Sequence, residues 1–285
     1  MTDRDHPRST VSTPSALGLA LGLALTGGCF DRTASNLEMR AAVGEIVAQG
    51  QAQAVENEIT EITTSFTIGG GVAEVAQEIQ AFAETQAPCS TVTGADNTLT
   101  IDFGVLDDAC TYRGHTYAGI VTIEISLDGA ATIIDHTYAD FTNGNITMNG
   151  DKKVTYSEQS RRVVTDYEFE TEDGELITTS SDRLQTLLDE SAGILGGIEI
   201  NGDRSWTGES GDWELNIDGV ELRWIDPVPQ SGVYSLVTPR DKTITMSFER
   251  VDDDTIAVIV DGGRNTKTYH VTTAGMIEEQ TEAAG

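Results

Sequence analysis

Two stretches of the chain carry apolar residues at the spacing of a helix. The first stretch contains no proline, and its apolar residues recur at spacings near three and four; they are Leu37, Val43, Ile46, Val47, Val55, Ile59 and Ile62. Three glycines at 69–71 interrupt this pattern, which resumes at Val72 and ends before Pro88. Because residues three and four apart share one face of an α-helix, residues 37–62 predict one or two amphipathic helices. Residues 72–86 predict another.

From about residue 90 onward, apolar and polar residues alternate, and β-branched types are enriched. This period of two is typical of strands with one buried face. The strand-like segments are 98–103, 118–126, 131–141, 145–150, 153–157, 163–170, 213–217, 220–225, 243–249 and 255–260. Residues 182–190 differ, because their leucines recur at helical spacing and predict a short helix or crossover.

Dipeptides that favour tight hairpin turns separate these segments. They are Asp128-Gly129, Asn143-Gly144, Asn149-Gly150, Asp173-Gly174, Asn201-Gly202, Asp218-Gly219 and Asp261-Gly262. Each pair readily adopts the positive φ angles that such turns require. The sequence therefore predicts a mainly β fold of consecutive antiparallel hairpins with N-terminal amphipathic helices. The strands form either one meander or a two-layer β-sandwich.

The N-terminus has the pattern of a lipoprotein signal peptide. Residues 16–25 form an uncharged apolar run of ten residues, which is too short to cross a bilayer and typical of a signal peptide. Residues 26–28 are small and precede Cys29, as in the lipobox read by lipoprotein signal peptidase. We expect Cys29 to be acylated, so that the protein is anchored in a bacterial cell envelope. Phe30, in place of the aspartate that signals inner-membrane retention, favours the outer membrane.

The number and spacing of the cysteines also support a location in the cell envelope. The chain has three cysteines, and Cys89 and Cys110 can pair across a short loop in an oxidising environment. This pairing leaves Cys29 unpaired, which acylation explains. The expected organisation is a signal peptide (1–28), a tether with a helical segment (29–88), an antiparallel β domain (89–273) and an acidic tail (274–285).

Charge limits the set of partners. The chain has 47 acidic and 17 basic residues, for a formal net charge of −30. Such a surface repels nucleic acid backbones and anionic headgroups, so we expect membrane association through the lipid anchor and no binding of nucleic acid. A protein or glycan partner stays unspecified.

Two sequence features suggest ligand binding. Asp252, Asp253 and Asp254 lie between two strand patterns, where they form a hairpin tip or weakly suggest a Ca²⁺ site. The aromatic residues Trp206, Trp213, Trp224 and Tyr234 lie close together in the sequence, either as core residues or as a face that stacks on carbohydrate.

No catalytic motif accompanies these features. The sequence lacks a metalloprotease, nucleophile-elbow, P-loop or dinucleotide motif, and no cofactor is expected. Three functions stay open. The first is a non-catalytic structural or binding lipoprotein, and the second is a carbohydrate- or calcium-binding surface module. The third is a carboxylate hydrolase, which requires two acids from different strands in one cleft, one of them partly desolvated.

The order of features also resembles a known group. A lipobox cysteine and a helical stretch precede TLTIDFG, RGHTYAGIVTIEI and DHTYADFTNGNITMNGDKKVTY, and SGVYSLVTP and TITMSFERVDDDTIAVIVDGG close the chain. Over roughly residues 89–270 this pattern resembles uncharacterised β-rich lipoproteins of Bacteroidetes and myxobacteria. The resemblance implies an envelope location and a β fold, and it assigns no reaction or site residue.

Overall fold

The computed structural model describes residues 33–46, 60, 66, 70–112, 114–223, 225–273 and 276–280. The chain divides into two compact units, residues 1–31 and 32–285, and every described residue belongs to the second. Cys29 and Trp224 lie outside the described residues.

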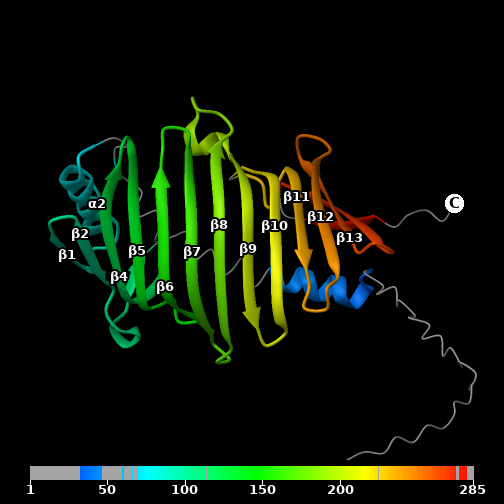
Figure 1. Ribbon diagram of the computed structural model, residues 1–285, viewed down its shortest axis with the longest axis horizontal. Coiled ribbons are helices and arrows are strands. Elements are labelled where there is room, and N and C mark those ends of the chain that lie inside the picture. Colours follow the sequence, from blue (N-terminus) through cyan, green and yellow to red (C-terminus); the bar gives the residue numbers. More distant parts are fainter. Residues whose placement is uncertain are drawn as a thin grey trace, which may run out of the picture. The chain divides into compact units, whose positions relative to one another are not determined.

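The described part of the chain is dominated by one antiparallel sheet of fifteen strands (Figure 1). The strands are β1 (Thr91–Ala95), β2 (Thr98–Asp102), β3 (Cys110–Tyr112), β4 (His115–Asp128), β5 (Ala131–Thr142), β6 (Ile146–Tyr156), β7 (Ser160–Thr171), β8 (Leu176–Leu187), β9 (Ile198–Gly208), β10 (Gly211–Leu222), β11 (Ser231–Val237), β12 (Thr243–Arg250), β13 (Thr255–Asp261), β14 (Thr266–Thr272) and β15 (Ile277–Gln280). Each strand pairs with its neighbours in chain order, except that β3 pairs only with β4. The mainly β prediction is confirmed, and the strand order is that of a meander.

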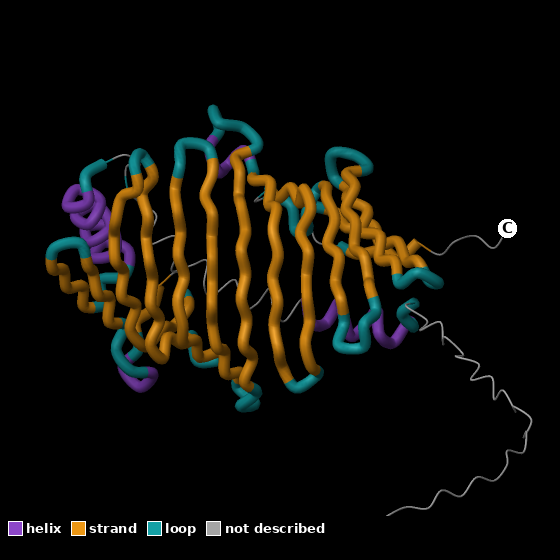
Figure 2. The backbone as a smooth tube through the Cα atoms, in the orientation of Figure 1, coloured by secondary structure: helices purple, strands orange, loops and turns teal. Residues whose placement is uncertain are grey.

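Among the described residues, α-helical segments and 3₁₀ turns accompany the sheet (Figure 2). The described part of the first helix covers residues 36–46, Thr60 is also α-helical, α2 spans Val72–Gln86, and the 3₁₀ turns are η1 (Leu106–Asp108) and η2 (Gly193–Gly196). The helix over 36–46 begins with a capping box, in which the Glu38 backbone N–H donates to Ser35 Oγ and the Ser35 N–H donates to Glu38 Oε2. The predicted helix over 72–86 is confirmed. Of the helical stretch predicted over 37–62, residues 47–59 and 61–62 lie outside the described residues.

The helices cover two separate cores on one face of the sheet. Val75, Ile79 and Ala83 of α2 pack with β1 to β7, and the 36–46 helix packs through Met39 and Ala42 with β9 to β14. Along β7 and β10 every second residue is buried and the intervening ones are largely exposed. This alternation defines an inner face that is covered and an outer face that contacts solvent.

Two Asn-Gly pairs that predict turns lie inside strands. Asn149-Gly150 is within β6 and Asn201-Gly202 is within β9, where both glycines have positive φ. A Cβ on Gly150 would lie 2.2 Å from the backbone oxygen of Asp166, and one on Gly202 would lie 2.1 Å from that of Asp182. These glycines therefore allow close approach of a neighbouring strand rather than chain reversal, and the predicted turns there are wrong. Asp218-Gly219 likewise lies within β10, beside a register shift against β11.

The helix predicted over 182–190 is also wrong, because residues 182–187 belong to β8. This strand pairs with β7 on one side and β9 on the other along most of its length. Leu184 is 46% exposed while Arg183 and Gln185 are buried, so the leucine spacing does not mark the covered face. The backbone hydrogen bonds to two neighbouring strands outweigh a short helical pattern. Part of the expected acidic tail forms β15, which pairs with β14.

Candidate functional site

A row of polar side chains crosses the inner face in the middle of the sheet. The strand register places His136 opposite Lys152, Lys152 opposite Thr165, Thr165 opposite Ser181 and Ser181 opposite Arg204. We call these five residues the inner polar row. All of them are at most 5% exposed. The row runs through the first core on β5 to β7 and reaches the second core at Arg204, beside Trp206.

Hydrogen bonds within the protein are made by His136, by Lys152 and between Thr165 and Ser181. Lys152 Nζ donates to Thr60 Oγ1, and Thr165 Oγ1 lies 2.7 Å from Ser181 Oγ. His136 Nδ1 lies 3.4 Å from the backbone oxygen of Lys152, and the His136 ring stacks on Tyr138. Because a buried cation is costly unless it is hydrogen-bonded or paired, these contacts mark the row as a network that organises the sheet.

Strand alternation separates charge between the two faces. Lys152 and Arg183 are buried on the inner face, whereas the adjacent residues Lys153 and Asp182 lie on the outer face. On the outer face Lys153 Nζ lies 3.2 Å from Asp135 Oδ1, and Arg162 donates to both carboxylate oxygens of Asp182. The sequence analysis missed the buried cations. The sequence pattern that could have identified them is a basic residue in the alternating positions that also carry core residues, as with Lys152, Val154 and Tyr156 of β6.

The two described tryptophans of the predicted aromatic cluster lie in the second core. Trp206 and Trp213 stack with their ring centroids 6.0 Å apart and their planes 6° apart, but they are only 3% and 4% exposed. Trp206 Nε1 donates to Glu45 Oε2 at 3.3 Å, and Trp213 Nε1 donates to Ser210 Oγ at 2.8 Å. The ring planes are nearly parallel, yet their buried faces do not provide a platform for a sugar ring.

Tyr234, the fourth aromatic candidate, also packs inward. Its ring makes an edge-to-face contact with Phe248 at a centroid distance of 5.4 Å. Burial raises the pKa of the Tyr234 hydroxyl above its ordinary value of 10.0. Tyr234 therefore contributes to the core that surrounds the tryptophan pair.

An apolar pocket of about 450 Å³ lies between the 36–46 helix and the turns that join β9 to β10 and β11 to β12. Its volume falls within the range of about 300–1,000 Å³ that is usual for small-molecule sites. Its lining residues are Leu37, Glu38, Ala41, Ser210, Trp213, Thr238, Pro239 and Arg240.

Glu38 is the one acid among these lining residues. Hydrogen bonds from the backbone and side chain of Ser35 lower its pKa below the ordinary value of 4.5, and Arg240 and Lys242 lower it further. Arg240 Nη1 lies 3.5 Å from Glu38 Oε1. The pocket can hold an apolar group, but its carboxylate stays ionised and is a poor general acid.

The other carboxyl groups with shifted pKa values are also stabilised in their ionised form. Hydrogen bonds lower the pKa of Asp182, Asp189 and Asp252, as they do for Glu38. A carboxylate hydrolase needs one acid whose pKa is raised by desolvation. Among the described residues, every carboxyl group with a resolved shift is moved in the opposite direction, which weighs against this mechanism.

The predicted calcium residues form the turn between β12 and β13. Asp252 Oδ1 accepts a hydrogen bond of 2.9 Å from the backbone N–H of Asp254, and this bond is the largest cause of the lowered pKa of Asp252. In the part of the chain that the structure describes, no three His, Cys, Asp or Glu side chains are placed to hold a metal ion. Asp252 thus stabilises its own turn, as a hairpin tip would predict.

The loop from β10 to β11 is held by a buried ion-pair cluster. The Asp226 side chain is inaccessible to solvent and contacts Arg223 Nε at 3.0 Å and Arg250 Nη2. Gln230 links this cluster to the sheet, because it accepts from Arg250 Nε at 3.2 Å and donates to Glu221 Oε2 at 2.9 Å. These contacts connect the proline-containing segment to β10 and β12.

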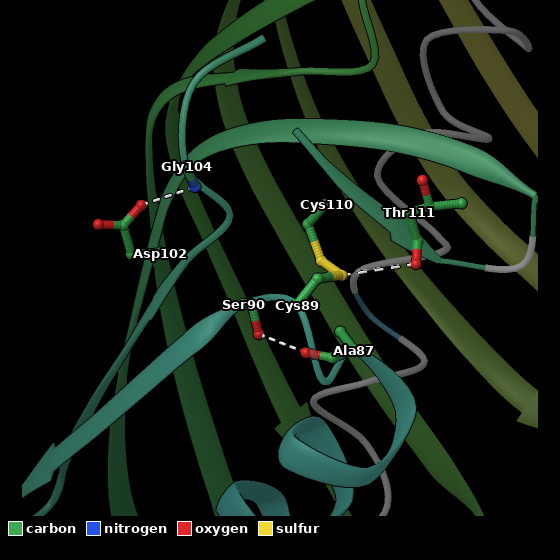
Figure 3. The surroundings of a disulfide bond; sticks show 7 residues. All are labelled: Ala87, Cys89, Ser90, Asp102, Gly104, Cys110 and Thr111. Atoms are coloured by element: carbon green, nitrogen blue, oxygen red, sulfur yellow. Dashed lines mark hydrogen bonds between the residues drawn. A yellow bond between two sulfur atoms is a disulfide. The ribbon is translucent and has the colours of Figure 1, made fainter. Parts of the chain in front are cut away.

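The predicted disulfide between Cys89 and Cys110 is confirmed (Figure 3). The Cα atoms of the two cysteines are 5.2 Å apart, within the usual range for a disulfide. The bond joins the segment after α2 to β3, so it fixes the helix against the first strands. Cys29 is therefore the remaining cysteine of the three.

Comparisons with known proteins add no functional name. No protein-family model, curated protein or solved structure matches the chain. Among the described residues, no helix has both the length and the apolar character needed to cross a bilayer.

Proposed function

We propose that this protein is a lipid-anchored lipoprotein of the bacterial cell envelope, held through Cys29, with a structural or binding role and no catalytic activity. The observation that carries the proposal is the Cys89–Cys110 disulfide. Disulfides form and persist in oxidising compartments outside the cytoplasm. Because this bond uses two of the three cysteines, Cys29 is left after a signal-like apolar run, where acylation explains its position.

The arrangement of polar groups supports a binding or structural role over catalysis. The buried ammonium group of Lys152 is hydrogen-bonded within the core, and the carboxyl groups with shifted pKa values are all stabilised as anions. Phe30 after the lipobox favours the outer membrane. Acyl chains contribute about 0.8 kcal/mol per buried methylene, so two or more chains would hold the protein on the bilayer.

The intact mass of the mature protein extracted from membranes tests this proposal. We expect a chain that begins at Cys29 and carries diacylglycerol, with two further thiols that become alkylated only after reduction. The matched control is Cys29→Ser, which should keep the disulfide, stay unacylated and leave the membrane fraction. An unacylated wild-type chain with a free Cys29 thiol would refute the anchoring.

A further inference from the structure

Three segments that are distant in the sequence form the apolar pocket of about 450 Å³. They are the first turns of the 36–46 helix, the β9–β10 turn with the start of β10, and the β11–β12 turn. Figure 1 shows the helix, in blue, beside the ends of β10 to β12. Protein interiors are close-packed and contain few voids larger than a water molecule. A pocket of this size is therefore more than a packing irregularity, and it can accept a small molecule.

The uncharged polar groups of the lining are bonded within the protein. Trp213 Nε1 donates to Ser210 Oγ at 2.8 Å, and the Ser210 hydroxyl donates to Glu45 Oε1 at 3.0 Å. Thr238 Oγ1 accepts from two backbone N–H groups of its own turn, at 3.4 and 3.2 Å. Because these atoms already have partners, a ligand in the pocket meets mainly apolar surface and the charged side chains at its border.

The apolar walls of the pocket are aliphatic and in contact with water. Leu37 is 78% exposed, and Ala41, which lies one turn further along the same helix face, is also exposed. Pro239 belongs to the facing β11–β12 turn and is exposed as well. An aliphatic chain placed between these residues would remove their apolar surface from water, and the resulting stabilisation grows with the area that is buried.

Two cations lie at the border of this pocket, in a chain whose acidic residues outnumber the basic ones by 47 to 17. Arg240 lines the pocket, and its side chain is 78% exposed. Its Nη1 lies 3.5 Å from Glu38 Oε1, but a guanidinium has five N–H donors, so donors remain for a ligand. Lys242 belongs to the same turn, and it lowers the pKa of Glu38 as Arg240 does. Both cations are therefore close to this side of the pocket.

The geometry points to the apolar pocket as a binding site for a free, single-chain fatty carboxylate. The aliphatic chain of this ligand lies against the apolar walls, and its carboxylate pairs with Arg240 and Lys242. A cationic amphiphile would fill the same walls, but these two side chains would repel its head group. The site supplies a ligand class for the binding role in the proposed function, and it does not depend on the acylation of Cys29.

Quenching of tryptophan fluorescence by ω-bromododecanoate tests this inference. Bromine quenches an indole only at close approach, and Trp213 lines the pocket. The full chain carries Cys29→Ser, so that no acyl chain of its own competes, and Trp224→Phe, so that only Trp206 and Trp213 emit. We expect saturable quenching that unbrominated dodecanoate reverses. The affinity should rise about fourfold for each methylene added between octanoate and dodecanoate, because each methylene buries further apolar surface.

Matched variants assign the binding to the pocket. Ala41→Phe fills the pocket and should weaken binding by about tenfold or more, because it displaces at least two methylenes of the ligand. Ala81→Phe, at an exposed position of α2, should leave the affinity unchanged. Arg240→Gln with Lys242→Gln should weaken the binding of dodecanoate about threefold and leave that of dodecanol unchanged. Lys153→Gln, which removes a cation of the outer face, is the control for the change in charge.

Several results would overturn the inference. They are the absence of saturable quenching, an affinity that Ala41→Phe leaves unchanged, or equal binding of dodecanoate and dodecyltrimethylammonium. Anionic phospholipid vesicles separate a free fatty acid from a bilayer lipid. We expect no flotation of the Cys29→Ser chain with them, and flotation that Ala41→Phe abolishes would assign the pocket to membrane lipid instead. Equal melting temperatures of the ligand-free variants exclude misfolding, and the mass at Cys29 of the membrane-extracted protein reports the proposed function separately.

Discussion

Removal of the disulfide should destabilise the first core by a predictable amount. The bond closes a loop with a sequence separation of 21 residues, between the end of α2 and β3. In the chain-entropy model, closing a loop of this length lowers the entropy of the unfolded chain and stabilises the fold by about 3.3 kcal/mol at 25 °C. We therefore expect Cys89→Ala with Cys110→Ala to lower the free energy of unfolding by about that amount. The corresponding decrease in Tm is about 10 °C.

Urea unfolding of the wild-type and double-alanine chains measures this difference, with both in a Cys29→Ser background so that no third thiol exchanges. The reduced wild-type chain is the matched control, because it retains both side chains and lacks only the bond. Cys110 is buried, so the alanine variant should lose slightly more than the reduced chain. A loss below about 1 kcal/mol in both arms would refute the loop-closure argument.

Three further predictions test contacts of the second core and the central sheet. Gly202→Ala should lower the free energy of unfolding by more than about 2 kcal/mol in urea, because the new Cβ would lie 2.1 Å from a backbone oxygen. Gly44→Ala, which has open space around the new Cβ within the 36–46 helix, should not destabilise the protein. Glu45→Gln should lower the free energy of unfolding by about 1–2 kcal/mol, because it replaces the charged acceptor of the Trp206 indole N–H. Tryptophan fluorescence during urea unfolding measures this difference. An unchanged unfolding midpoint would show that this bond contributes nothing to stability. Because the pKa of Glu38 is lowered in the folded state, its contribution to stability is present above pH 4.5 and is lost as the pH falls through the folded-state pKa. In Glu38→Gln the free energy of unfolding should therefore fall less steeply with acid than in the wild-type chain. Parallel plots of the free energy of unfolding against pH for the two chains would contradict this.

Much of the secondary structure could be predicted from local patterns. The helix over 72–86 follows from its apolar spacing, and β4, β5 and β7 follow from a period of two, whereas β6 was predicted as two separate segments. Local patterns gave the wrong prediction where a residue is needed for the close approach of a neighbouring strand. Gly150 and Gly202 read as turn residues because positive φ is usual in turns, yet each accommodates a close backbone inside a strand.

The candidate sites were less predictable, because a residue's role depends on what covers it. The cysteine count identified Cys89 and Cys110 correctly, since pairing in an oxidising compartment is a constraint visible in composition. Trp206 and Trp213 fitted either a core or a sugar-binding face, and their burial beneath the 36–46 helix decided for the core.

The sequence by itself determined the β class and the disulfide, because strand alternation and cysteine pairing are local or compositional constraints, whereas three of the seven turn dipeptides lie inside strands. The tertiary structure alone decided which polar residues of the central strands are buried. Alternation assigns Lys152 and Arg204 to one face of the sheet. Only the register across four strands aligns them with Thr165 and Ser181, and only the packing of Thr60 against Lys152 shows that this face is covered.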